Sequence, residues 1–144
     1  MALYDREMQF SDNQLPANGT VVGADVYDTG LPAGANLNQN RELQILAEVE
    51  TAFAGGTSIN AQFVESDNDD LSSPDVLLES GVTALADLTA QARLLDGPVP
   101  RTSKRYVGIR YVVVGAMSAG GISAGIVRDI QTKDFLPQST GQVA

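Results

Sequence analysis

The stretch Arg105–Gln131, RYVGIRYVVVGAMSAGGISAGIVRDIQ, decides the fold of this chain. Its middle, GAMSAGG (115–121), is the most glycine-rich point of the sequence. A glycine-rich turn cradles phosphate when a helix follows it, and it joins two strands when a strand follows it. The segment after the glycines therefore separates a nucleotide enzyme from a β-protein.

Both flanks of this turn alternate with a period of two. One face before the turn collects Val107, Ile109, Tyr111 and Val113. One face after it collects Ile122, Ala124, Ile126 and Ile130, with Arg128 breaking the pattern. Such alternation in segments rich in Val, Ile and Tyr is typical of β-strands. The stretch also lacks the lysine of a P-loop. We therefore predict strand, turn and strand, with the glycines supplying the positive φ values of a tight hairpin.

A second segment repeats this plan upstream. RELQILAEVE (41–50) and TSINAQF (57–63) alternate in the same way, and TAFAGG (51–56) joins them. TVVGADV (20–26) reads as another strand, and DTGLPAGANLNQN (28–40) reads as a long loop.

The segment LLESGVTALADLTAQARLLDGPVP (77–100) is ambiguous. Leu85, Leu88 and Ala92 fit a short helix, whereas 92–95 also fits the opening of a strand. Short strands separated by turn signals predict an all-β fold. We expect one domain over 1–144: an antiparallel β-sandwich of jelly-roll type, with an extended N-terminal arm (1–14) and one short helix.

The composition excludes several classes of function. The 144 residues contain no cysteine and no histidine, so disulfides, thiol nucleophiles, Cys/His zinc sites and an imidazole base are excluded. The formal net charge of −9 disfavours nucleic acid as a partner, because that affinity depends on Lys and Arg. No apolar run is long enough to span a membrane, and the charged first ten residues do not resemble a secretory signal. We expect a soluble protein made in the cytoplasm.

The carboxylate clusters have simpler explanations than chemistry. ESDNDD (65–70, the acidic loop) lacks the glycine and distal glutamate of an EF-hand, so we interpret it as a solvated loop, with a weak cation site as the alternative. The pairs Asp25/Asp28 and Glu48/Glu50 would need a defined separation across a cleft to act as a glycoside hydrolase. We expect no catalytic and no metal-binding residues.

Two regions are candidates for protein contacts. Within the arm, Tyr4, Met8 and Phe10 are large apolar groups that either pack onto the chain's own sandwich or dock on another subunit. Farther along, Lys104, Arg105 and Arg110 alternate with Tyr106 and Tyr111. These side chains suit either contact with an acidic protein partner or charges that protect a strand edge.

Four stretches resemble one family in order and spacing: YDREMQFSDNQ, RELQILAEVETAFAGGTSINAQF, LLESGVTALADLTAQARLLDGPVP and RYVGIRYVVVGAMSAGGISAGIVRDIQ. Together they resemble the capsid cement (stabilising or decoration) proteins of tailed bacteriophages, typified by the Bordetella phage cement protein. The resemblance implies a jelly-roll protein that lies on the outer surface of an icosahedral head and ties neighbouring major capsid proteins together. It implies a homodimer (with a trimer as the alternative), no enzyme activity, no cofactor and no membrane partner.

By elimination, the expected contact residues are Tyr4, Arg6, Met8 and Phe10 in the arm, with Arg105 and Tyr106 as a second surface. The protein would be made in the host bacterial cytoplasm and end on the virion. The alternative function is a carbohydrate-binding jelly-roll module displayed on the particle, which requires exposed aromatic side chains above a groove. A small Asp/Glu hydrolase is the third reading.

Overall fold

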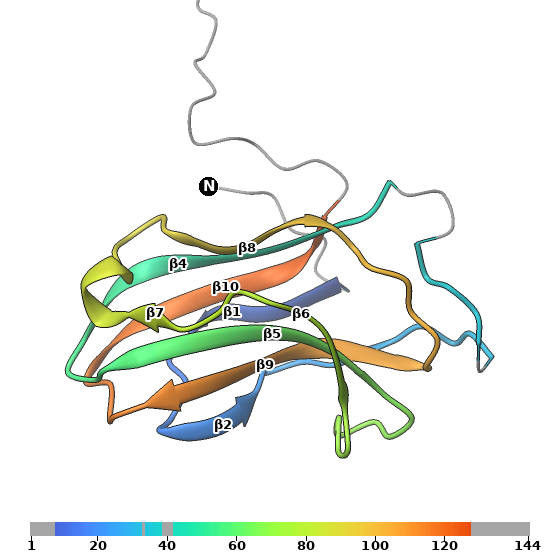
Figure 1. Ribbon diagram of the computed structural model, residues 1–144, viewed down its shortest axis with the longest axis horizontal. Helices are drawn as coiled ribbons and strands as arrows, with labels where there is room; N and C mark the ends of the chain where they lie inside the picture. Colours follow the sequence, from blue (N-terminus) through green and yellow to red (C-terminus); the bar gives the residue numbers. More distant parts are fainter. Residues whose placement is uncertain (1–7, 33, 39–41, 128–144) are drawn as a thin grey trace, which may run out of the picture.

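The computed structural model describes residues 8–32, 34–38 and 42–127, and these form two layers of β-strands (Figure 1). The elements are β1 (Gln9–Gln14), β2 (Gly19–Val22), β3 (Tyr27–Asp28), β4 (Gln44–Ala54), β5 (Ser58–Ser66), β6 (Asp75–Glu79), β7 (Thr83–Ala84), the 3-10 turn η2 (Leu85–Asp87), β8 (Arg93–Pro98), β9 (Tyr106–Val114) and β10 (Ala119–Val127). Among these residues no helix is long and apolar enough to cross a membrane.

The strand order identifies the fold as a jelly roll. Sheet A has the order β1-β10-β4-β8, and sheet B has β2-β9-β5-β6, with β3 and β7 added at its edges; every pair is antiparallel. The pairs β1 with β10, β2 with β9, β4 with β8 and β5 with β6 arise when an eight-stranded chain folds in half and wraps around itself. The predicted antiparallel jelly-roll sandwich is confirmed.

The two glycine-rich turns do not make the hairpins that the sequence predicted. Strands follow both turns as expected, but β4 and β5 lie in different sheets, as do β9 and β10. Each turn instead crosses from one sheet to the other, so that β4 pairs with β10 and β5 pairs with β9. The two strand–turn–strand units therefore lie side by side, and each strand of one unit is hydrogen-bonded to a strand of the other.

Close packing explains the glycines of these turns. A Cβ on Gly55 (φ +96°) would lie 2.9 Å from the Ser118 amide nitrogen, and a Cβ on Gly115 (φ +87°) would lie 3.1 Å from the Gly56 Cα. The turns therefore need glycine both for positive φ and because the two backbones touch.

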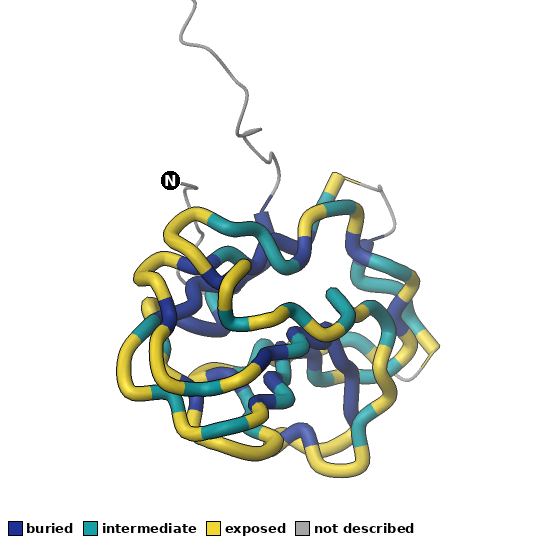
Figure 2. The backbone as a smooth tube through the Cα atoms, turned by 60° about the vertical axis from the view of Figure 1, so that its left-hand side comes forward, coloured by how far each residue is buried: buried dark blue, intermediate teal, exposed yellow. Residues whose placement is uncertain are grey.

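The core lies between the sheets and is built from the faces that alternation predicted. Val107, Ile109, Tyr111 and Val113 of β9 face Ile122, Ala124 and Ile126 of β10 across it, and all belong to one buried cluster. Figure 2 shows that burial runs along the strands and that most turns are exposed. Ile130, which was placed on the same face, lies outside the described residues.

The expected short helix is reduced to one turn. Leu85, Ala86 and Asp87 form η2, and Leu88 enters the core with 1% exposure. Gln91 then adopts a φ of +68°, which does not continue a right-handed helix. The chain returns to sheet A as β8, in agreement with the strand alternative.

The second half of the predicted N-terminal arm (1–14) is a strand of the sandwich. Gln9–Gln14 forms β1 at the edge of sheet A, where it pairs with β10. Residues 1–7 lie outside the described part of the chain. The alternation that marks other strands is disturbed here because the register shifts twice, between Gln9 and Ser11 and again before Gln14.

Candidate interaction surfaces

Of the four candidate contact residues near the N-terminus, two pack in or against the core and two lie outside the described residues. Phe10 is fully buried, with its ring centroid 6.2 Å from that of Phe63, and Met8 packs partly buried against the same cluster. These two side chains contact the chain's own sandwich, so Phe10 is corrected from a contact residue to a core residue. Tyr4 and Arg6 lie outside the described residues.

A chain of hydrogen bonds runs from the buried Tyr111 hydroxyl to the end of β1. The Tyr111 hydroxyl donates to Ser11 Oγ at 2.8 Å, and Ser11 Oγ donates to Gln14 Oε1 at 2.8 Å. Gln14 Oε1 also accepts from the Ala24 amide at 2.9 Å. Burial raises the pKa of Tyr111, so its hydroxyl stays protonated and can donate. This chain of hydrogen bonds links β9 of sheet B to β1 of sheet A, in addition to the pairing of β1 with β10.

Arg105 and Tyr106 form a compact surface group at one end of sheet B. Arg105 Nε and Nη2 donate to the two carboxylate oxygens of Asp28 at 2.7 and 2.8 Å, and the guanidinium lies 5.3 Å from the Tyr106 ring centroid. Hydrogen bonding from Arg105, and then from the Gly30 amide, lowers the pKa of Asp28 below 3.8. The arginine side chain is 54% exposed. A planar, paired cation on an aromatic ring is thus presented to solvent.

A buried carboxylate holds the loop before this group. Glu65 is 3% exposed and accepts hydrogen bonds from the Ser103 amide at 2.7 Å, the Ser103 hydroxyl at 3.0 Å and the Lys104 amide at 3.1 Å. Lys104 Nζ in turn lies 2.8 Å from Asp75 Oδ2. Glu65 therefore holds the loop at Ser103 and Lys104 in place.

The acidic loop is anchored by Leu71, whose side chain packs into the space (the notch) that Gly108 leaves by having no side chain. Leu71 is 2% exposed, and a Cβ on Gly108 would lie 2.5 Å from Leu71 Cδ1. Within the described residues, no group of three Asp or Glu side chains is arranged to hold a metal ion. Asp67, Asp69 and Asp70 are exposed, in line with the interpretation of this segment as a solvated loop.

The basic-aromatic series does not form one cluster. Tyr111 points into the core, whereas Arg110 lies on the outer face of sheet B. Arg110 Nε and Nη2 donate to Gln62 Oε1 at 2.9 and 2.7 Å, and Gln62 Nε2 donates to Glu79 Oε2 at 3.1 Å. Strand alternation separates residues that are adjacent in sequence.

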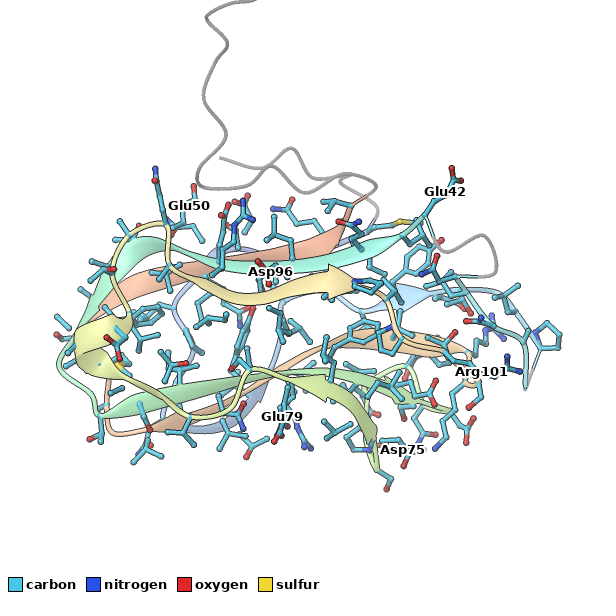
Figure 3. The ribbon with its side chains drawn as sticks, turned by 45° about the horizontal axis from the view of Figure 1, so that its top comes forward. Glu42, Glu50, Asp75, Glu79, Asp96 and Arg101 are labelled. Carbon is cyan, nitrogen blue, oxygen red and sulfur yellow. The ribbon has the colours of Figure 1, made fainter. Side chains whose placement is uncertain are left out.

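Of the carboxylates considered for hydrolysis, Asp25, Asp28 and Glu50 are exposed and Glu48 is partly buried. Figure 3 shows Glu42 and Glu50 above sheet A and Asp75 and Glu79 on the side of sheet B. Glu50 accepts a hydrogen bond from the Ser123 hydroxyl, and Asp28 is paired with Arg105. These contacts give one member of each pair, Glu50 and Asp28, a structural partner.

Exposed aliphatic side chains are the surface feature that sequence reasoning missed. Among the described residues, the large hydrophobic side chains that remain exposed are Leu15 (47%), Val76 (42%), Val82 (77%) and Val114 (51%). Val114 could have been found, because it ends the outward row of a predicted strand. Val82 carried no signal, since it follows a glycine in the ambiguous segment.

The comparison with known families covers most of the sandwich. The family model described as Bbp16 matches residues 10–126, about four-fifths of the chain's 144 residues. The match begins at Phe10 and ends within β10, so it includes nearly all strands described above. No curated protein matches the chain.

Proposed function

The chain belongs to the Bbp16 family, a name that points to a Bordetella phage protein, and from this membership we propose that it is a capsid cement protein. In this role it binds the outer surface of an icosahedral phage head and ties neighbouring major capsid proteins together. The family match over 10–126 is the observation that carries the proposal. The jelly-roll fold supports it, because the resemblance to cement proteins implied that fold.

The described surface suits adhesion through many small contacts. Most of its cations are already satisfied within the chain: Lys104 by Asp75, Arg105 by Asp28 and Arg110 by Gln62. Such a surface would bind a partner through its shape and through polar groups that are already paired, and not through one strongly charged site. Symmetry repeats each contact around a shell, so weak single contacts add up to firm attachment.

The proposal also names the residues that would make the contacts. Arg105 and Tyr106 form one candidate contact, and Tyr4 and Arg6 of residues 1–7 form another. Self-association as a homodimer, with a trimer as the alternative, is part of the same proposal. The expected place of the protein is the outer capsid surface.

The sugar-binding alternative finds no platform in the described part of the chain. Phe10, Phe53, Phe63 and Tyr111 are buried, Tyr27 is partly buried, and Tyr106 lies beneath Arg105. Sugar stacking requires an exposed aromatic face, so these placements favour the cement function.

Reconstitution tests the proposal. Purified protein is added to phage heads that lack it, and we expect saturable co-sedimentation and a higher temperature of head disruption. Binding to immobilised glycans without binding to heads would refute the cement function. For the contact residues, Arg105→Ala should weaken co-sedimentation, whereas Arg101→Ala, an exposed cation in the same loop, should not. Deletion of residues 1–7 tests the contact role of Tyr4 and Arg6 while leaving β1 complete.

A further inference from the structure

Asn18 is the one asparagine of the sequence that is followed by glycine. Each of the other six precedes a residue with a side chain: Asn13, Asn36, Asn38, Asn40, Asn60 and Asn68. The side-chain carbon of an asparagine lies within reach of the next residue's backbone nitrogen, so the two can close a succinimide ring. Glycine in the second position favours the ring, because it has no Cβ to obstruct the closure and its backbone adopts more conformations.

The structure places this pair of residues in open surroundings. Asn18 directly precedes β2, Gly19 is the first residue of β2, and both are exposed. Gly19 has a φ of +107°, and a Cβ built on it would meet no atom within 4 Å. The space beside the pair is therefore free for the ring and for the water that opens it.

A backbone donor already points at the carbonyl that would react. The Gly115 amide donates a hydrogen bond to Asn18 Oδ1 at 3.1 Å. When a nucleophile adds to the side-chain carbon, negative charge develops on Oδ1, and an N–H group fixed beside that oxygen stabilises the charge. Among the described residues, none accepts a hydrogen bond from Asn18 Nδ2, which is the nitrogen that leaves.

We propose that Asn18 is a site of spontaneous deamidation. The Gly19 backbone nitrogen attacks the side-chain carbon of Asn18 and forms a new C–N bond. The proton of that nitrogen passes to Asn18 Nδ2, the bond between Nδ2 and the side-chain carbon breaks, and ammonia departs from a succinimide. Water then adds its oxygen to one of the two ring carbonyl carbons, the C–N bond of that carbonyl breaks, and a proton of the water goes to the ring nitrogen.

The two products of ring opening differ in their effect on the fold. Both add a carboxylate to a chain of net charge −9. Opening at the side-chain carbonyl gives aspartate, which keeps an oxygen acceptor near the Gly115 amide. Opening at the main-chain carbonyl gives isoaspartate, which lengthens the backbone by one carbon and displaces the carboxylate. The isoaspartate form should lose the hydrogen bond that joins the turn before β2 to the turn between β9 and β10.

The pairing of Gly19 with Val113 opposes the reaction, because the attacking nitrogen lies in a strand. This strand is short, with four residues, and β2 stands at the end of the strand order of sheet B. Terminal residues of an edge strand open locally at little cost in free energy, without unfolding of the core. Opening at Gly19 is therefore enough to release its nitrogen in the folded protein.

Ageing of the full-length protein tests the proposal. The folded protein is incubated at mildly alkaline pH, where the attacking nitrogen loses its proton more readily, and samples are digested and sequenced by tandem mass spectrometry. We expect the peptide that contains Asn18 to gain the mass of an amide-to-acid change and to separate into aspartate and isoaspartate forms. Hydrogen exchange at Gly115 and along β2 should become faster in step with the isoaspartate form.

Two other exposed asparagines serve as controls within the same molecule. Asn13 Oδ1 also accepts a hydrogen bond, from the Thr51 hydroxyl at 3.0 Å, but Gln14 follows it. Asn68 lies in the acidic loop and is followed by Asp69. Most of the Asn18 peptide should be converted before conversion at either control is detected.

A variant and an unfolded sample complete the experiment. Asn18→Gln would need a larger ring, so it should keep its side-chain amide and show constant exchange at Gly115 over the same time. If the protein unfolded in urea is converted at Asn18 while the folded protein keeps its amide, the pairing with Val113 blocks the attack and the proposal is overturned. Conversion at Asn13 or Asn68 as fast as at Asn18 would overturn it as well.

Discussion

Replacing Phe10 by alanine tests whether the start of the chain is core or arm. The side chain is 0% exposed and packs against Phe63, so its removal leaves a cavity between the sheets. Buried Phe→Ala changes cost about 3–5 kcal/mol, a large part of the roughly 5–15 kcal/mol that stabilises a domain. With a urea dependence of about 2 kcal/mol per molar, the unfolding midpoint should fall by about 2 M.

The assay is equilibrium urea denaturation followed by circular dichroism. Leu15→Ala is the matched control, because Leu15 directly follows β1 and is 47% exposed. We expect the control to change the free energy of unfolding by no more than about 0.5 kcal/mol. A similarly small change for Phe10→Ala would refute the placement of β1 in the sandwich. For the same reason, deletion of residues 1–10 should destabilise the fold and is not a clean test of an arm.

Three further predictions concern single contacts. Ser11→Ala leaves the Tyr111 hydroxyl buried without its acceptor, so the free energy of unfolding in urea should fall by about 1–3 kcal/mol. Adding Tyr111→Phe should recover most of this loss. Additive losses from the two changes would contradict the hydrogen bond between Tyr111 and Ser11. Gly108→Val should push the Leu71 side chain away from its position against Gly108. We expect the free energy of unfolding to fall by about 1–3 kcal/mol and hydrogen exchange in the acidic loop to become faster. Unchanged exchange would refute this packing. The lowered pKa of Asp28 means that its pairing stabilises the fold at neutral pH, and this contribution is lost as the pH falls from about 3.8 through the folded-state pKa. Arg105→Gln should raise the pKa of Asp28 in an NMR titration, and an unmoved titration would show that the pair is not formed.

Local alternation was enough to predict the long central strands. Ile45, Ala47 and Val49 of β4 and Ile59, Ala61 and Phe63 of β5 lie in the core, as their period of two indicated. The same pattern excluded a phosphate loop, because the residues after Gly121 read as a strand. These features depend only on neighbours along the chain, so a single sequence contains them.

Features that depend on distant neighbours could not be predicted in the same way. Nothing local shows that Gly55 and Gly115 approach each other, so both turns were taken for hairpins, although they cross between sheets. β1 was missed because its register shifts hide the alternation, and Phe10 looked like part of an arm. The buried role of Glu65 depends on amides 38 and 39 residues away.

The surface residues divide in the same way, into those that the local sequence reveals and those that only the fold brings together. Arg105 and Tyr106 were identified as a group from their adjacency, and the structure adds Asp28 from 77 residues away. Val82 and Val114 become neighbours of a single face only through pairing with β5. A surface that spans several strands is therefore visible only after the fold is known.

Cryo-electron microscopy of heads saturated with the added protein is the most direct test of the cement function. We expect two-layered jelly-roll density on the outside of the shell, over junctions between capsid subunits. Heads whose outer surface stays bare at the same protein concentration would contradict it.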